Sequence, residues 1–171
     1  PVAEPRPEDG AARSRVLPIA LFVLTVVTVF MAGVVHLPAE SLGGALRNGA
    51  EFAAALMGIL VFHEAGHYVA ARRRGIDTSL PYFIPMPPFL SIFGTMGAVI
   101  LMRGRIRSRD ALVEVGAAGP LAGMAVALPL LLVGLADCPV GPMLTEGFME
   151  GQSLLYLLAK RVVLGPIPEG Y

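Results

Sequence analysis

The sequence predicts an all-α polytopic membrane protein with three transmembrane helices and a short membrane-embedded β or re-entrant segment. Hydrophobic residues make up 55% of the 171 residues and charged residues only 15%, whereas about 25% of the residues of a soluble domain are charged. This composition excludes a disordered chain, and the lone Cys138 excludes a disulfide scaffold. Basic and acidic residues balance at 13 each, so no overall positive charge indicates nucleic-acid binding.

Residues 1–15 are polar, charged and rich in proline, which predicts a disordered cytosolic tail. Residues 16–37 carry no charged side chain, and a helix of this length crosses about 30 Å of hydrocarbon. A signal peptide is the alternative, but its apolar core has only about 7–15 residues and a small-residue cleavage site follows it. Because no clear site of that kind follows here, we interpret residues 16–37 as the first transmembrane helix.

The second and third predicted spans differ in their polar content. Residues 52–71 begin with a purely apolar stretch and continue into a cluster of polar residues within the span. A helix over 112–136 carries no charge after Glu114, whose carboxylate we expect to pair with a nearby arginine. Its interior holds prolines that predict a kink and glycines typical of close helix packing: Pro120, Pro129, Gly119 and Gly123.

Residues 81–102 also lack charge, so hydropathy alone would make them a further span. Prolines and glycines argue against a continuous helix, namely Pro81, Pro85, Pro87, Pro88, Gly94 and Gly97. A crossing here would also place the arginines of 72–74 and 103–109 on opposite sides of the membrane, against the positive-inside rule. We therefore predict a non-helical segment over 81–107 that enters the membrane and returns, with strand-like alternation from Met102 to Arg107.

The arginines define one orientation for the whole chain. With the N-terminus in the cytosol, the three crossings place residues 137–171 on the outer side, where acidic residues are tolerated. Residues 154–164 are too short to cross and contain Lys160 and Arg161, so we expect an interfacial helix there and a core that continues beyond residue 171. His36 is interpreted as an interfacial residue, Cys138 as a residue without a role, and the arginines of 72–74 as a topology signal.

The second span contains the pattern His-Glu-x-x-His at His63, Glu64 and His67. Two histidines four residues apart on a helix both reach one ion, and imidazole nitrogen is a preferred zinc ligand. In such sites zinc lowers the pKa of a water to about 7 and the glutamate accepts its proton. With this histidine and glutamate content, chance predicts about 0.003 such patterns in the chain. The alternative is a histidine pair satisfied within the core, although an acidic residue inside a span indicates function.

Three blocks of the sequence resemble the site-2 protease family of intramembrane zinc metalloproteases, over about residues 52–136. The first is Phe62-His63-Glu64-Ala65-Gly66-His67-Tyr68 with Ala71-Arg72 and Gly75-Ile76. The second is Pro81-Tyr82-Phe83-Ile84-Pro85 with Gly94-Thr95-Met96-Gly97-Ala98-Val99-Ile100. The third is Gly116-Ala117-Ala118-Gly119-Pro120-Leu121-Ala122-Gly123. The metalloprotease core predicted in this way covers residues 49–136.

This resemblance implies an endopeptidase that cuts a transmembrane segment of another membrane protein near the cytosolic face. His63 and His67 then correspond to zinc ligands and Glu64 to the catalytic glutamate, while a strand over 97–107 would pair with an unwound substrate. The family's third ligand is an aspartate in a later Asn-Pro…Asp-Gly motif, which we expect downstream of Tyr171. Three aspartates are left unassigned: Asp77, Asp110 and Asp137.

Two alternatives to the protease remain from the sequence. One is a proteolytically inactive relative that binds transmembrane helices as an adaptor, and the weaker one is a zinc carrier. The expected partners are a transmembrane protein substrate and the lipid bilayer, with no nucleic acid, and the sequence does not indicate an oligomeric state. The expected location is a multi-pass position in a bacterial inner membrane, with a plastid membrane as the second choice.

Overall fold

The computed structural model describes residues 15–103, 108–137, 151 and 153–165. The predicted tail, the end of the predicted strand at 104–107, Cys138 and most of the outer loop lie outside the described residues. The elements follow in the order α1 (Val16–His36), α2 (Leu42–Arg73), β1 (Tyr82–Pro85), β2 (Thr95–Val99), α3 (Arg109–Ala136) and α4 (Leu154–Val163). The chain is therefore mainly helical, as predicted.

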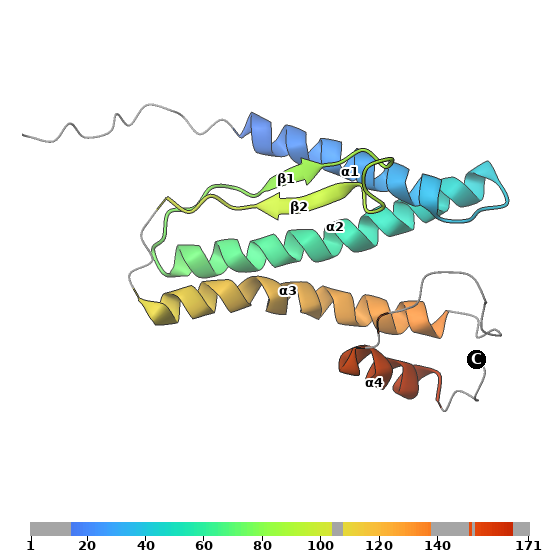
Figure 1. Ribbon diagram of the computed structural model, residues 1–171. Helices are drawn as coiled ribbons and strands as arrows, with labels where there is room; N and C mark the ends of the chain where they lie inside the picture. The colour runs from blue at the N-terminus through green and yellow to red at the C-terminus, as the bar shows by residue number, and fades with distance from the viewer. Residues whose placement is uncertain (1–14, 104–107, 138–150, 152, 166–171) are drawn as a thin grey trace, which may run out of the picture.

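Helices α1, α2 and α3 run side by side in alternating directions, with α2 packed between the other two (Figure 1). In the part of the chain that the structure describes, these three helices are long and apolar enough to cross a membrane. They confirm three long apolar helices at the predicted places, and their crossing of a membrane stays a prediction. The orientation of the bundle relative to the cytosol stays a prediction.

Helix α2 begins ten residues earlier than the predicted span, at Leu42 instead of residue 52. The Ser41 hydroxyl caps the helix by accepting a hydrogen bond from the Gly44 amide at 3.1 Å. One turn further on, Arg47 Nε donates to Glu51 Oε1 at 2.6 Å, an i,i+4 pair that stabilises exposed helix. These local interactions extend α2 beyond its apolar stretch, which hydropathy alone does not reveal.

The segment between α2 and α3 contains an antiparallel pair of strands and no helix among the described residues. Tyr82 pairs with Val99 and Pro85 with Thr95. The paired strand ends at Val99, and Met102 forms an isolated bridge with Thr78. Proline lacks the amide hydrogen that a ladder needs, so Pro81 and Pro85 keep β1 and its partner short. Of the strand predicted over 97–107, the structure thus shows residues 97–99 in β2, while residues 104–107 lie outside the described residues and their pairing stays a prediction.

Both ends of the hairpin segment meet at the same end of the helix bundle. The Arg103 amide donates to the Asp77 carbonyl at 2.8 Å, and the Ser79 amide donates to the Leu101 carbonyl at 2.9 Å. Between these contacts the hairpin runs along α1 and α2 (Figure 1). The segment therefore leaves and returns at one end, as the arrangement of the arginines requires. Its depth in a membrane stays a prediction.

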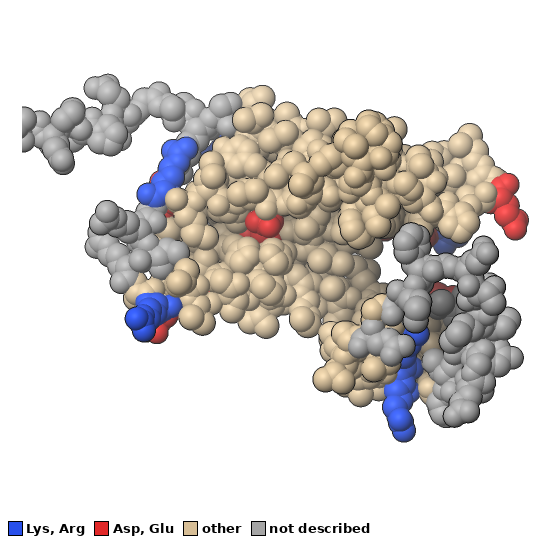
Figure 2. Space-filling model, viewed as in Figure 1, with Lys and Arg blue, Asp and Glu red and all other residues tan. Residues whose placement is uncertain are grey.

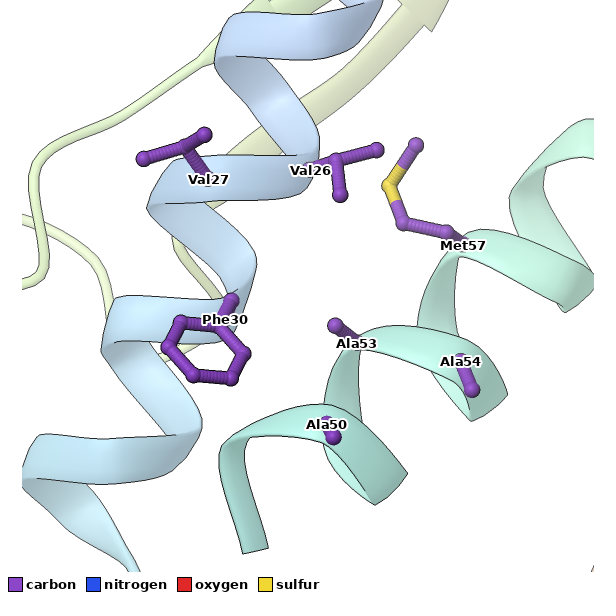
Figure 3. A pocket seen from close by; sticks show the side chains of 7 residues that line it. All are labelled: Val26, Val27, Phe30, Ala50, Ala53, Ala54 and Met57. Atoms are coloured by element: carbon purple, nitrogen blue, oxygen red, sulfur yellow. The ribbon is translucent and has the colours of Figure 1, made fainter. Parts of the chain in front are cut away.

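The hairpin is held in place by the core between α1 and α2. The buried residues of this core are Val29, Ala53, Met57 and Phe83. The Phe83 ring packs edge to face against Phe22, with ring centroids 5.2 Å apart. Beside this core lies a groove of about 440 Å³ with an apolar lining, as expected for a surface in hydrocarbon. Figure 3 shows the residues that line it: Val26, Val27, Phe30, Ala50, Ala53, Ala54 and Met57.

Replacing Gly94 with alanine is expected to loosen the hairpin from α1. Gly94 has a φ of +73°, and a Cβ there would collide with the backbone of α1, lying 2.7 Å from the Val29 Cα. The left-handed backbone costs an alanine about 1–2 kcal/mol, and the collision adds to this cost. Hydrogen exchange of the β2 amides should therefore become faster. Gly97→Ala is the control, since Gly97 has a φ of +95° but faces open space; equal effects of the two variants would contradict the contact with α1.

The ends of the bundle carry the charged groups. Figure 2 shows basic and acidic side chains gathered at the two ends, with acidic atoms also exposed in the middle of an otherwise uncharged surface. Helix α4 packs against α3 near the end of that helix (Figure 1). A helix at the predicted place, residues 154–164, is thus confirmed, and its interfacial location stays a prediction.

Candidate metal centre

The two histidines of the motif converge on one point beside α2. His63 and His67 lie one helical turn apart, and their Nε2 atoms are 3.1 Å from each other. The rings meet edge to face, with centroids 4.8 Å apart and planes at 76°. Two nitrogens that share a tetrahedral zinc at about 2.0–2.1 Å each lie about 3.4 Å apart. The pair therefore fits two ligands of a single zinc ion.

A backbone carbonyl of α3 fixes the orientation of the second histidine. His67 Nδ1 donates a hydrogen bond to the Val115 carbonyl oxygen at 2.7 Å. Because a carbonyl only accepts, the proton must lie on Nδ1, and the Nε2 lone pair of the neutral ring is then free to bind a metal. Hydrogen bonds of this kind orient metal-binding histidines in proteins generally. Sequence reasoning missed Val115, since a backbone carbonyl has no residue-type signal.

Glu64 lies between the two histidines in the sequence and is buried, with 7% of its surface exposed. An ionisable side chain inside a transmembrane helix is expensive and indicates a functional role. Its place beside the converging imidazoles is the one expected of a group that handles protons at a metal-bound reactant.

No third ligand joins the histidines within the described residues. Among them, no group of three or more His, Cys, Asp or Glu side chains could hold a metal ion. The internal aspartates lie at element ends: Asp77 follows α2, Asp110 is in the first turn of α3, and Asp137 caps the end of α3. The structure thus brings together the two predicted ligands and leaves these aspartates elsewhere.

Helices α2 and α3 approach closely at the motif. Gly66, within the motif, faces the Ala118 carbonyl of α3, and a Cβ at Gly66 would lie 2.8 Å from the Ala118 carbonyl carbon. Such a close approach requires glycine. It brings the α3 backbone within hydrogen-bonding distance of His67.

An ion pair joins α2 to α3 at the end of the bundle where α2 ends, and a second pair joins α2 to the segment that follows it. Arg74 donates to the Glu114 carboxylate, which confirms the pairing predicted for Glu114. This hydrogen bond and the negative charge of Glu114 raise the pKa of Arg74. Arg72 lies 3.6 Å from the Asp77 carboxylate. Exposed pairs of this kind contribute only about 0–1 kcal/mol each, so they align the helix ends more than they stabilise them.

Comparison with known proteins agrees with this geometry. The family model for peptidase family M50 matches residues 51–163. The chain belongs to peptidase family M50. The resemblance to the site-2 protease family predicted from the three sequence blocks is thereby confirmed.

Several curated proteins are similar to this M50 chain. It is 33% identical over 128 residues to "Probable zinc metalloprotease EGY2, chloroplastic" of Oryza sativa subsp. indica, an alignment covering 73% of the chain and 23% of the relative. The protein of that name from Arabidopsis thaliana is 34% identical over 172 residues, covering 96% of the chain and 29% of the relative. The chain thus spans only about a quarter of the length of these relatives. No solved structure matches it.

Proposed function

We propose that this M50 chain carries part of the active site of a zinc-dependent intramembrane endopeptidase, which cleaves a transmembrane segment of another membrane protein. The observation that carries the proposal is the convergence of the His63 and His67 Nε2 atoms, 3.1 Å apart, beside the buried Glu64 on a helix able to span the membrane. The names of the relatives, zinc metalloproteases, support the same chemistry.

In this proposal His63 and His67 hold the zinc ion and Glu64 is the general base. When bound, zinc supplies a Lewis acid that makes water reactive near neutral pH. Glu64 accepts the proton of the attacking water and returns it to the nitrogen of the departing peptide. The hydrogen bond from His67 to the Val115 carbonyl would leave the Nε2 lone pair free to bind the ion.

A peptide bond inside a transmembrane helix must be exposed before it is attacked, because the helix satisfies its own carbonyls. The hairpin offers a way to hold an opened substrate, since each strand of a two-stranded sheet has one unpaired edge. An extended peptide binds such an edge through backbone hydrogen bonds. We propose that the β1–β2 hairpin plays this role, with the lipid bilayer as the environment of both enzyme and substrate.

The third zinc ligand and the location belong to the same proposal. The ligand implied by the family is an aspartate downstream of Tyr171. The relatives are named chloroplastic, which favours a plastid membrane over the bacterial inner membrane preferred from the sequence alone. Nothing in the comparisons favours the adaptor or the zinc carrier, and a zinc carrier would need further polar groups along the spans.

Zinc content is the direct test of this proposal. The full-length protein in detergent is expected to hold about one zinc per chain, and His67→Ala to lose it, because the substitution removes one ligand of a three-ligand site. His36→Ala is the matched control, since His36 Nε2 contacts the Pro88 carbonyl at 3.0 Å, far along the bundle from the motif. Metal analysis after gel filtration measures the zinc content of the wild type and of the two variants. Wild-type protein without zinc would overturn the metal site and favour the adaptor.

A further inference from the structure

Gly119 and Gly123 of α3 face the motif histidines directly. A Cβ at Gly119 would collide with the imidazole of His67, and the nearest ring atom is Nε2. A Cβ at Gly123 would lie 3.3 Å from both Cβ and Nδ1 of His63. The two glycines are one turn apart on α3, as the two histidines are on α2. Each glycine therefore makes room for one histidine, whereas the sequence indicated only general helix packing.

We infer that Gly119 and Gly123 are positioning residues that hold the two imidazoles where a metal ion can bind both. This inference rests on the proposed zinc site and adds to it the part of α3 that shapes the site. Neither glycine touches the metal in this inference. Each acts through the histidine that it faces.

The His67 ring is confined from two sides by the same face of α3. The Val115 carbonyl accepts its Nδ1 hydrogen bond at 2.7 Å. Gly119 lies four residues later, on the same helix face, and its missing side chain leaves the space taken by the other side of the ring. A methyl group at position 119 would push the His67 Nε2 away from His63. The His67 ring could move aside only by weakening its hydrogen bond to the Val115 carbonyl.

Gly66 shows that this role differs from helix packing. A Cβ at Gly66 would meet the backbone of Ala118, so the helices themselves would have to separate. The three atoms nearest to a Cβ at Gly119 all belong to the His67 side chain. A side chain is displaced by an added methyl group more easily than the backbone of a packed helix is. Alanine at 119 should therefore displace the ligand and leave the fold intact.

The test compares Gly119→Ala with Gly116→Ala in the full-length protein in detergent, with zinc affinity measured by competition with a chelator. Gly116 is the matched control, since it lies about one turn before Gly119 on the same helix and a Cβ there meets nothing within 4 Å. Gly119→Ala should bind zinc about 10–100-fold more weakly, the usual effect of disturbing the groups that orient a ligand. Gly116→Ala should bind zinc as the wild type does.

A second readout needs no metal. In zinc-free protein with ¹⁵N-labelled histidine, the wild type should show the His67 Nδ1 proton bonded to a carbonyl, and Gly119→Ala should shift or lose that signal. A role in packing alone would lower the thermal stability of Gly119→Ala and leave this signal in place. The signal therefore separates positioning of His67 from general packing.

The possible results divide clearly. If the wild type binds no zinc, the proposed function fails, and the histidine spectra still decide whether Gly119 positions His67. If the wild type binds zinc and Gly119→Ala binds it equally well, the positioning role is overturned. Should Gly119→Ala fail to fold, Gly123→Ala decides: its milder contact of 3.3 Å predicts a folded protein with weaker zinc binding, and unchanged binding overturns the inference.

Discussion

Glu64→Gln in the full-length protein is expected to abolish proteolysis while zinc remains bound. Glutamine has nearly the same size as glutamate but does not accept a proton at neutral pH, so the variant loses the general base and keeps the packing of a buried side chain. Loss of a general base lowers rates by about 10²–10⁴-fold. Cleavage of a reporter with a single transmembrane helix, reconstituted in lipid, measures this loss alongside the zinc content.

The control for this variant lies on the same helix. Glu51→Gln also removes one carboxylate from α2, but Glu51 is exposed and pairs only locally with Arg47. It should cleave the reporter at the wild-type rate. Normal turnover by Glu64→Gln would contradict its role as the base. Loss of zinc together with activity would instead assign Glu64 to the metal's ligand set or to the packing around it.

The three long helices were predictable because a helix that can cross a membrane must have a long stretch without charged residues. The stretches without charged residues predicted the bounds of α1 and α3 to within a few residues. The early start of α2 was missed because it depends on the Ser41 cap and the pair of Arg47 and Glu51, which stabilise a polar extension of an apolar helix. The strand predicted over 97–107 overlaps β2 only at residues 97–99, and its charged end at 104–107 lies outside the described residues. Pairing depends on a partner, and β1 offers its hydrogen bonds to residues 95–99.

The site was predictable only as far as it depends on side chains. The spacing of His63 and His67 follows from the helix period, and the structure confirms that both Nε2 atoms meet. The Val115 carbonyl could not be found in this way, because every residue has a carbonyl and only the approach of α3 selects one. From the sequence, Gly119 and Gly123 of α3 are interpreted only as helix-packing residues. The sequence does not show that they face imidazole side chains and not the backbone of another helix.

The approach of α2 and α3 thus determines the site as much as the motif does. The motif supplies two nitrogens on one helix, and the neighbouring helix supplies the carbonyl that orients one of them. A change in the distance between the helices should therefore alter both the stability of the fold and the zinc site. The residue that controls this distance lies inside the motif itself.

Gly66→Ala is expected to destabilise the packing of α2 on α3 and to weaken zinc binding at the same time. The added Cβ would lie 2.8 Å from the Ala118 carbonyl carbon and 2.9 Å from the Ala122 Cβ, and helix backbone does not swing aside as a side chain does. Overpacking costs about 1–3 kcal/mol, which exceeds the gain of up to about 1 kcal/mol from alanine's helix propensity.

Gly58→Ala provides the matched comparison, two turns earlier on α2. There the nearest atom to an added Cβ is Val126 Cγ1 at 3.9 Å, an ordinary contact, so this variant should be as stable as the wild type or slightly more so. Denaturation in detergent measures both variants, and zinc competition shows whether separating the helices breaks the hydrogen bond between His67 and Val115. If Gly66→Ala unfolds under the same conditions as Gly58→Ala, then α3 does not approach closely enough to orient His67, and zinc binding must depend on the motif helix alone.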